Sequence, residues 1–455
     1  MSASQNATSG QTATFAAIVC AKNYDALDGN AIAAVKRLIL DGVAVAIAGT
    51  AEDAPKIYAA HTRATGGRAE STLWGFGCKV PASAAAYANA VSMHVLDFEP
   101  MSSPPTHAVS PVVPVALALA EAQGGNGREV IAACAKGFEI QGRILAAAKP
   151  ARGALPFHSP GVMGPMGSAV TAAHLLKLDA SQLANALGMA SSRCAGLPAN
   201  SGSMVKCTHC GNAAAAGLEA ALLAARGFTA NPAIFEAKHG YVQTFFAPHF
   251  DYDVLFGFGM PWRCVEPGMA IKFYPSKYPT HFVITAALEA RKTIKAVSEI
   301  KSVRIVSPEI LDANRPRPRV GLEGKFSIQY AAAAALLDGA VGIQTFTDAR
   351  RFAADMESLL GKIVLDFDKN IPPDTNNMHM KVEVTLNDGS LHTGVCHKPP
   401  GTWGEVIDEA QHRAKISDCL RVRLDADKTV RVIAAFEKLE TLDASQLQAL
   451  LALLA

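Results

Sequence analysis

The sequence lacks any strong imbalance of charge and any long uninterrupted apolar run. Its 42 Lys and Arg residues against 40 Asp and Glu residues leave a formal net charge of +2, too small a surplus to favour nucleic acid or an anionic membrane. No stretch of about 20 residues is apolar enough to cross a bilayer without a Gly, Pro or charged residue interrupting it. We therefore expect neither a nucleic-acid nor a membrane partner.

A secretory signal and a disulfide framework are also missing. The first dozen residues, MSASQNATSGQT, are small and polar, whereas a signal peptide needs a basic start and an apolar run. We expect this end of the chain to be frayed. The nine cysteines are odd in number and scattered, which is typical of a reducing compartment. A cytoplasmic location is the simplest expectation.

Several motifs of known chemistry are absent as well. There is no phosphate-binding loop, no Rossmann glycine pattern and no Gly-x-Ser-x-Gly elbow. The run Cys207-Thr208-His209-Cys210 resembles a metal or redox motif, but no second pair follows at a zinc spacing and no thioredoxin-like strand precedes it. The sequence therefore predicts no metal site.

What the chain does have is length and many small apolar residues. Its 455 residues exceed one ordinary core, so we expect two domains. From about Thr12 to Trp262 apolar residues recur at helical spacing. One such segment ends at Gly49, as helices often do, and another begins with Asp179 as N-cap and Gln182 three residues later.

The composition changes after about Gly268. The runs IKSVRIVS, GKIVLDFD and MKVEVTLNDGSLHTGVCH read as strands, and the last contains the hairpin signal Asn-Asp-Gly at 387–389. Helical stretches at 279–294 and 326–339 lie among them, and the end of the chain is helical again. The predicted fold is mainly α with a smaller α+β domain. It has an all-helical domain over residues 1–267, an inserted α+β lid domain over 268–403 and a C-terminal helical segment over 404–455 that returns to the helical domain.

One stretch, HVLDFEPMSSPPTHAVSP at 94–111, carries unusual chemistry. Asp97, Glu99 and His107 lie between two apolar helices in a segment stiffened by prolines. A buried charge is costly unless it is paired or used, so we expect this segment to form one wall of a polar cleft. Structural alternatives stay open. The structural alternative for Asp97 is that it only caps the next helix or pairs with Arg143 or Lys206. A lone histidine such as His94 or His61 is more often a core or surface residue than a functional one.

Three further segments gather reactive side chains among apolar residues. His158 precedes glycines and a helix, Lys206 and His209 begin another helix, and GMAIKFYPSKYPTHF contains Lys272, Tyr274, Lys277 and His281. Helix N-termini and glycine-rich turns present free N–H groups that suit carboxylates, and lysines suit anions. A site built this way favours a small, multiply negative acid. The alternative is that Lys206 and Lys277 are solvated surface lysines.

With these segments in order, the sequence resembles the MmgE/PrpD family, which includes 2-methylcitrate dehydratase, cis-aconitate decarboxylase and iminodisuccinate epimerase. The resemblance covers nearly the whole chain and rests on ANAVSMHVLDFE, KGFEIQGRI, ANALGMASSRCAGL, MVKCTHCGNAAAAGLEAALLAARGFTA and IKFYPSKYPTHFVITAALEA. It implies a helical domain with a smaller α+β domain, a homodimer, and no metal or organic cofactor. By motif, the family's active-site residues fall on Asp97, His107, His158, Lys206 and Lys272.

The chain also departs from the family pattern. It reads Glu99-Pro100 where members often carry two Asp residues, and Met101 where Thr is common. Lys277 stands where decarboxylase relatives carry a His. This last change replaces a proton donor with a fixed cation, which argues against decarboxylation as the specific reaction.

We therefore predict a cofactor-free lyase that dehydrates or hydrates a citrate-like di- or tricarboxylate. Lys206 and Lys272 would hold carboxylates and stabilise a carbanion, and His107 and His158 would move protons. Asp97 would orient His107 or act as the base itself. We predict Lys277, His209, His281 and Tyr274 as substrate-binding residues. The alternatives are an epimerase of a dicarboxylate such as iminodisuccinate, a cis-aconitate-type decarboxylase, and a catalytically silent carboxylate-binding member.

Overall fold

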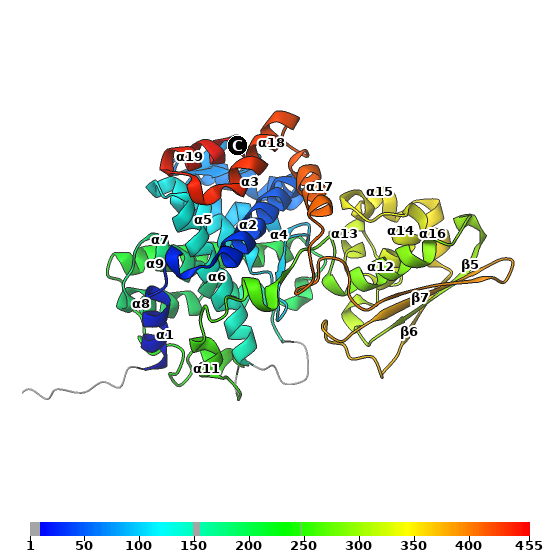
Figure 1. The fold of residues 1–455 in the computed structure, drawn as a ribbon, viewed down its shortest axis with the longest axis horizontal. Helices are drawn as coiled ribbons and strands as arrows, with labels where there is room; N and C mark the ends of the chain where they lie inside the picture. Colours follow the sequence, from blue (N-terminus) through cyan, green and yellow to red (C-terminus); the bar gives the residue numbers. More distant parts are fainter. Residues whose placement is uncertain (1–9, 149–154, 247) are drawn as a thin grey trace, which may run out of the picture.

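The computed structural model describes residues 10–148, 155–246 and 248–455. A large helical part lies beside a smaller part built around a sheet (Figure 1), which confirms the predicted fold class. The helices of the large part are α1 (Gln11–Cys20), α2 (Gly29–Gly49), α3 (Asp53–Thr65), α4 (Ala82–His94), α5 (Val109–Gln123), α6 (Gly127–Ala148), α7 (Ser159–Leu175), α8 (Ala180–Ser191), α9 (Val205–Ala225), α10 (Tyr241–Phe246) and α11 (Tyr252–Phe256). The predicted capping box of Asp179 and Gln182 is present at the start of α8.

Helices α7 and α9 pack closely because small residues line their contact. A Cβ added at Gly217 of α9 would lie 2.4 Å from the Cβ of Ser168 on α7, so a larger side chain would force the helices apart. His158 is the N-cap residue of α7, and Lys206 and His209 lie in the first turns of α9. Close packing of these two helices therefore brings the three side chains to one place.

The smaller part contains a four-stranded sheet in the order β6-β5-β7-β8. Its strands are β5 (Ile300–Ser307), β6 (Ile363–Phe367), β7 (Met380–Leu386) and β8 (Leu391–Cys396). β5 runs parallel to β6, and the other pairs are antiparallel. Each predicted strand is present, and the 387–389 turn joins β7 to β8. Along β7, every second residue is buried, as expected when one face of a strand meets a core.

Helices cover the sheet and connect it to the rest of the chain. The smaller part holds α12 (Tyr278–Arg291), α13 (Gly321–Gly324), α14 (Ile328–Asp338), α15 (Asp348–Arg351) and α16 (Ala354–Leu360). In Figure 1, α12 and α14 lie along the sheet, and their buried residues share one apolar core with β5 and β7.

The last helices of the chain pack on the helical part, against α2 and α5. They are α17 (Glu409–Leu420), α18 (Ala426–Glu437) and α19 (Ala444–Ala452), and they lie beside α2 and α5 in Figure 1. Ile416, Val432 and Leu447 belong to the same apolar core as α2. The boundaries at residues 267 and 403 stay predictions.

Two short strand pairs complete the fold, and one of them joins the two parts. Strands β1 (Ser71–Leu73) and β2 (Cys78–Val80) form a small antiparallel pair within the helical part. Strand β3 (Met101–Ser102) pairs with β4 (Met269–Ala270), with Met101 opposite Ala270. β3 comes four residues after Asp97 and β4 ends two residues before Lys272, so this strand pair brings Asp97 and Lys272 together.

The start of the chain corrects one expectation. Gln11 and Thr12 belong to α1, so they are not frayed as predicted, whereas residues 1–9 lie outside the described part. Thr12 is fully buried and its amide and hydroxyl both donate to the Glu236 carboxylate, at 3.1 and 2.5 Å. A polar residue is thus accommodated in a core because both of its donors are satisfied.

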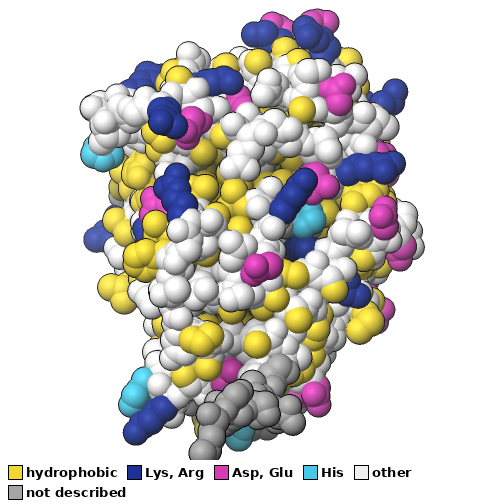
Figure 2. Space-filling model, turned by 90° about the vertical axis from the view of Figure 1, so that its left-hand side faces the viewer, with side chains coloured by type: hydrophobic (Ala, Val, Ile, Leu, Met, Phe, Trp, Pro, Cys, Tyr) yellow, Lys and Arg dark blue, Asp and Glu magenta, His cyan; other side chains and the backbone are white. Residues whose placement is uncertain are grey.

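Neither the helices nor the visible surface indicates a membrane or a polyanion. Among the described helices, none combines the length and apolarity that a bilayer crossing requires. On the face shown in Figure 2, basic and acidic side chains are interspersed without a large patch of one sign.

Candidate active site

A cavity of about 380 Å³ lies between the helical part and the sheet-containing part. Six of the predicted site residues line it, namely Asp97, His107, His158, Lys206, Lys272 and Lys277. Apolar side chains, among them Met101, Phe157 and Phe326, form the rest of the wall. A few convergent polar groups in a mainly apolar cavity are typical of a small-molecule site.

Asp97 lies at the centre of this site, between two lysines. Its carboxylate accepts from Lys206 Nζ through Oδ2 and from Lys272 Nζ through Oδ1. Burial alone would raise the pKa of Asp97, but the two ammonium groups hold that pKa well below its usual range. Of the two predicted pairings, the one with Lys206 is present, whereas Arg143 binds Glu139 instead.

The backbone around Asp97 is unusual and is held by lysines. Asp97 has a φ of 52°, a left-handed conformation that few residues other than glycine adopt and that often marks functional segments. Three successive carbonyl oxygens accept from three buried lysines of different elements, each at 3.0 Å: Leu96 from Lys325, Asp97 from Lys272, and Phe98 from Lys415 of α17. Lys325 and Lys415 were not predicted from the sequence. Lys325 is 229 residues from Leu96 along the chain, and Lys415 is 317 residues from Phe98.

His107 lies closer to Glu99 than to Asp97, which was expected to orient it. Its Nδ1 lies 3.0 Å from Glu99 Oε1, whereas its Nε2 lies 3.7 Å from Asp97 Oδ1, beyond hydrogen-bond distance. The same Glu99 oxygen lies 2.5 Å from His94 Nδ1 and accepts from Ser110 Oγ at 2.9 Å. Glu99 and His94 were not predicted as site residues. Their only signal was a carboxylate five positions after an imidazole in the proline-stiffened segment.

His158 and His209 form the other side of the imidazole group. Their Nδ1 atoms lie 2.9 Å apart, so one ring donates to the other. The His158 amide donates to the Gly196 carbonyl at 3.0 Å, which fixes the start of α7. Burial lowers the pKa of His158 well below its ordinary value, and the nearby Lys206 charge adds to this. The ring is therefore neutral near pH 7.

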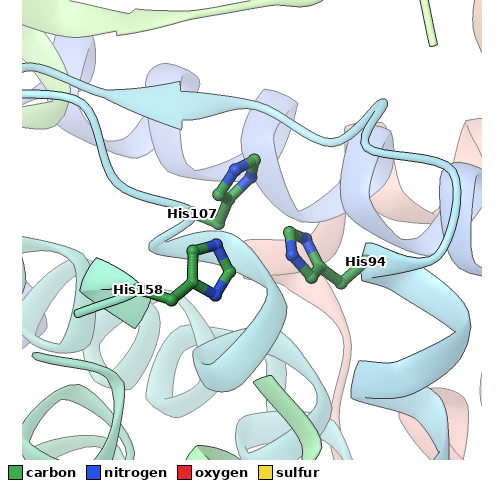
Figure 3. A group of neighbouring side chains, drawn as sticks. All are labelled: His94, His107 and His158. Atoms are coloured by element: carbon green, nitrogen blue, oxygen red, sulfur yellow. The ribbon is translucent and has the colours of Figure 1, made fainter. Parts of the chain in front are cut away.

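The rings of His94, His107 and His158 face a common space (Figure 3). One nitrogen from each lies within 4.8 Å of the others, which is close enough for three imidazoles to share an ion. Burial of the His94 ring is the main cause that lowers its pKa to about 4, and the charge of the neighbouring Lys206 also lowers it. The Lys206 ammonium opposes a cation at this place, whereas the Glu99 carboxylate favours one, so the absence of a metal and the role of the imidazoles in proton transfer stay predictions.

The remaining predicted residues lie at the edge of the cavity or behind it. Lys277 lies at the edge, where its ammonium pairs with Asp312, which also lines the cavity. His281 and Tyr274 are buried behind Lys272, with ring centroids 5.2 Å apart, and neither lines the cavity. His209 reaches it only through His158. His281, Tyr274 and His209 thus lie outside the cavity wall, and their assignment as substrate-binding residues stays a prediction.

The two cysteines near His209 do not behave as ligands or redox groups. Cys207 donates to the Met204 carbonyl at 3.0 Å, and Cys210 is fully buried. Burial raises the pKa of both thiols, to about 12 for Cys207. Because the thiolate is the reactive form, both side chains are packing residues.

Comparisons with known proteins agree with this arrangement. The MmgE/PrpD N-terminal domain matches residues 13–253, and the MmgE/PrpD C-terminal domain matches residues 274–441. The chain is 30% identical to the cis-aconitate decarboxylase of Mus musculus, covering 95% of this chain and 91% of the mouse protein. It is also 30% identical to the cis-aconitate decarboxylase of Homo sapiens, covering 95% of this chain and 92% of the human protein. It is 26% identical to the cis-aconitate decarboxylase of Aspergillus terreus strain NIH 2624, covering 88% of this chain and 87% of the fungal protein. With both family domains matched in order and the fold and cavity in agreement with the resemblance, this chain belongs to the MmgE/PrpD family.

Proposed function

We propose that this protein is a lyase that acts on a small tricarboxylate and breaks a C–COO⁻ bond, as in the decarboxylation of cis-aconitate. The observation that carries the proposal is the cavity in which Asp97, Lys206 and Lys272 form one ionic group beside His107. The similarity to cis-aconitate decarboxylases over 95% of the chain supports this reaction. It moves decarboxylation, the third choice from sequence alone, ahead of dehydration.

The lysines supply positive charge for an anionic substrate. Two ammonium groups share the single carboxylate of Asp97, so the group keeps a surplus positive charge toward the cavity. Lys206 also lies 5.0 Å from the centre of the Phe326 ring, which limits the positions that its side chain can adopt. Preorganised cations of this kind stabilise negative charge as it develops in the transition state.

The proposed reaction needs one proton and no external oxidant. As the C–COO⁻ bond breaks, carbon dioxide leaves and the electron pair stays on the substrate carbon, conjugated with a neighbouring carboxylate. Lys206 and Lys272 bind that carboxylate while the charge is delocalised. A proton carried by the imidazole of His107 then forms the new C–H bond, and solvent restores that proton to the ring.

A dehydratase remains the second candidate, because of Lys277. Lys277 lines the cavity where decarboxylase relatives carry a His, and it pairs there with Asp312. A fixed cation at this position can bind a third carboxylate but cannot cycle a proton near neutral pH. That property suits elimination of water from a fully carboxylated substrate at least as well as decarboxylation.

Proton NMR in D₂O separates these reactions in one assay. Purified protein is incubated with citrate, 2-methylcitrate, cis-aconitate and a racemisable dicarboxylate in turn. We expect loss of carbon dioxide and one deuterium in the product from cis-aconitate. Water loss from citrate or 2-methylcitrate would favour the dehydratase, and deuterium exchange alone would favour an epimerase. Absence of any turnover would contradict a lyase.

A cofactor-free reaction also stays a proposal with its own test. We expect turnover to be unchanged after prolonged dialysis against EDTA, because the lysines take the role of the electrophile. An activity that EDTA abolishes and Zn²⁺ or Fe²⁺ restores would contradict this, and His94, His107 and His158 would then be the first residues to test. The homodimer and the cytoplasmic location stay predictions.

A further inference from the structure

One buried carboxylate oxygen, Glu99 Oε1, lies close to three polar atoms: the contacts with His94 and Ser110 are hydrogen bonds, and the contact with His107 is close but not aligned as a hydrogen bond. It lies 2.5 Å from His94 Nδ1, 3.0 Å from His107 Nδ1 and 2.9 Å from Ser110 Oγ. Glu99 is fully buried and does not line the cavity. Burial would raise the pKa of the Glu99 carboxyl, but its contacts with the two imidazoles hold that pKa well below its usual range. The group is therefore an ionised carboxylate, which can only accept hydrogen bonds.

The acceptor character of Glu99 decides where the imidazole protons lie. A neutral imidazole has one N–H and one lone pair, and which nitrogen carries the proton is set by the partner of the other. His94 Nδ1 carries a hydrogen because it bonds this obligate acceptor, and a hydrogen on His107 Nδ1 avoids placing a nitrogen lone pair 3.0 Å from the carboxylate. The Nε2 atom of His107 is then a lone pair, and it lies on the side of Asp97, 3.7 Å from Oδ1.

We propose that Glu99 is a positioning residue that fixes His94 and His107 as Nδ1–H tautomers, so that Nε2 of His107 is the nitrogen that takes a proton from solvent and passes it to the substrate carbon. The inference rests on the proposed function only in assigning proton transfer to His107. It extends that function by naming the residue that prepares His107 and the atom that exchanges the proton.

Asp97 cannot have this role in the described arrangement. Both of its carboxylate oxygens accept from ammonium groups, one from Lys206 and one from Lys272. A lone pair on His107 Nε2 facing a carboxylate at 3.7 Å makes no hydrogen bond. The two carboxylates of the segment thus have different tasks, because Asp97 holds the lysines and Glu99 holds the imidazoles.

Several charged or titratable groups surround Glu99 and His107, and a pH test has to account for them. They come from the Asp97 segment and from the elements packed against it: Asp97, His94, His158, Lys206, Cys207, Cys210 and Lys272. A change at Glu99 alone leaves these groups in place. A moved pH limb therefore reports the loss of the Glu99 charge.

The test is Glu99→Gln, with Ser110→Ala as the matched control. The amide keeps the size of the side chain but removes the negative charge, which destabilises the protonated imidazole of His107. We expect kcat to fall about 10²-fold or more with KM nearly unchanged, and the alkaline limb of the kcat/KM profile to move to lower pH. Ser110→Ala removes one donor but keeps the carboxylate and both imidazoles, so its alkaline limb should stay at the wild-type pH.

A Glu99→Gln enzyme with wild-type kcat and an unmoved alkaline limb overturns the proposal. If that variant does not fold, wild-type protein with ¹⁵N-labelled histidine gives the answer, with the His107 signals assigned from the His107→Gln spectrum. We expect a protonated Nδ1 and a lone-pair Nε2, and the opposite tautomer overturns the proposal. The NMR result does not depend on turnover, so an inactive wild-type protein would refute the proposed function while leaving the tautomer measurable.

Discussion

At the scale of single residues, the site depends on how few negative charges balance its lysines. Asp97 alone faces Lys206 and Lys272, and burial lowers the pKa of Lys272 against the opposing effect of Asp97. An incoming substrate carboxylate therefore completes the charge balance and need not break an existing pair. This distinguishes these lysines from the surface pairs of the chain, which are largely screened by water.

Lys206→Met and Lys272→Met test the charge argument. Each removes a charge-assisted hydrogen bond worth about 1.5–3 kcal/mol, so kcat/KM should fall roughly 10–150-fold. Lys292→Met is the matched control, since Lys292 is exposed and pairs only with Glu289 one helical turn away; its kinetics should equal wild type. Steady-state kinetics on the three variants checks this. Unchanged kinetics for Lys206→Met would assign that lysine to structure alone.

His107→Gln tests proton transfer. Gln can still donate to Glu99 but cannot exchange a proton near neutral pH, so kcat should fall about 10²–10⁴-fold with little change in Tm. Kinetics and thermal unfolding are measured on the same preparation. His379→Gln serves as the control, because that ring stacks on His397, 4.9 Å away and apart from the cavity. A His107 variant that loses stability but keeps its kcat would make His107 a structural residue.

At the scale of elements, periodic segments were predictable and short contacts were not. The strands at 300–307 and 380–386 and the turn between β7 and β8 follow from alternation and turn chemistry. The β3–β4 pair has two residues in each strand, too short for any periodic pattern. Yet this pair, more than any long strand, places Asp97 near Lys272.

The same limit applies to the site. Asp97, His107, His158, Lys206 and Lys272 were found because each lies in a recognisable segment, and the cavity brings them together. The roles of Glu99 and Lys415 depend on which way a side chain points and on contacts between distant segments. Spacing along the chain gives no information on the direction of a side chain or on contacts between distant segments. Asp97 was therefore predicted to orient His107, the role that we propose for Glu99.

Helix α17 offers a test of how far the site depends on the C-terminal segment. Lys415 is buried and binds Asp41 of α2 at 2.8 Å and the Phe98 carbonyl at 3.0 Å. Lys415→Met leaves Asp41 with only His412 as partner, and removing one partner of a buried pair costs about 3–5 kcal/mol. We expect a clear fall in Tm and in kcat, because the carbonyl next to Asp97 loses its donor.

Arg413→Gln on the same helix is the control for Lys415→Met. Arg413 pairs with Glu437 at the surface, and such a pair contributes about 0–1 kcal/mol. Both variants are compared by thermal unfolding and by steady-state kinetics. Equal Tm values for the two would show that Lys415 does not hold the Asp97 segment.

At the scale of the whole molecule, the cavity lies where two separate apolar cores meet. One core spans α1 to α11 with the C-terminal helices, and the other surrounds the sheet. The site takes Asp97, His107, His158 and Lys206 from the first part, Lys277 from the second, and Lys272 from the connection between them, where Ile271 and Phe273 pack in the first core. A ligand that binds residues of both parts therefore adds a connection between them, and its binding energy also stabilises their relative position.

This arrangement predicts that a tricarboxylate raises the unfolding temperature only when both sets of cations are intact. The catalytically impaired His107→Gln protein is used with cis-aconitate, so that the ligand is not consumed during the scan. At 100 times the Kd, a ligand that binds only the folded state contributes about 2.7 kcal/mol, which corresponds to a rise in Tm of a few degrees. Sodium sulfate at equal ionic strength controls for a general salt effect. Adding Lys272→Met to His107→Gln should abolish most of the rise, because the cavity loses the buried cation at the connection between the two parts. If the double variant is stabilised by cis-aconitate as much as His107→Gln alone, the substrate is held by the helical part and the two-part site proposed here is wrong.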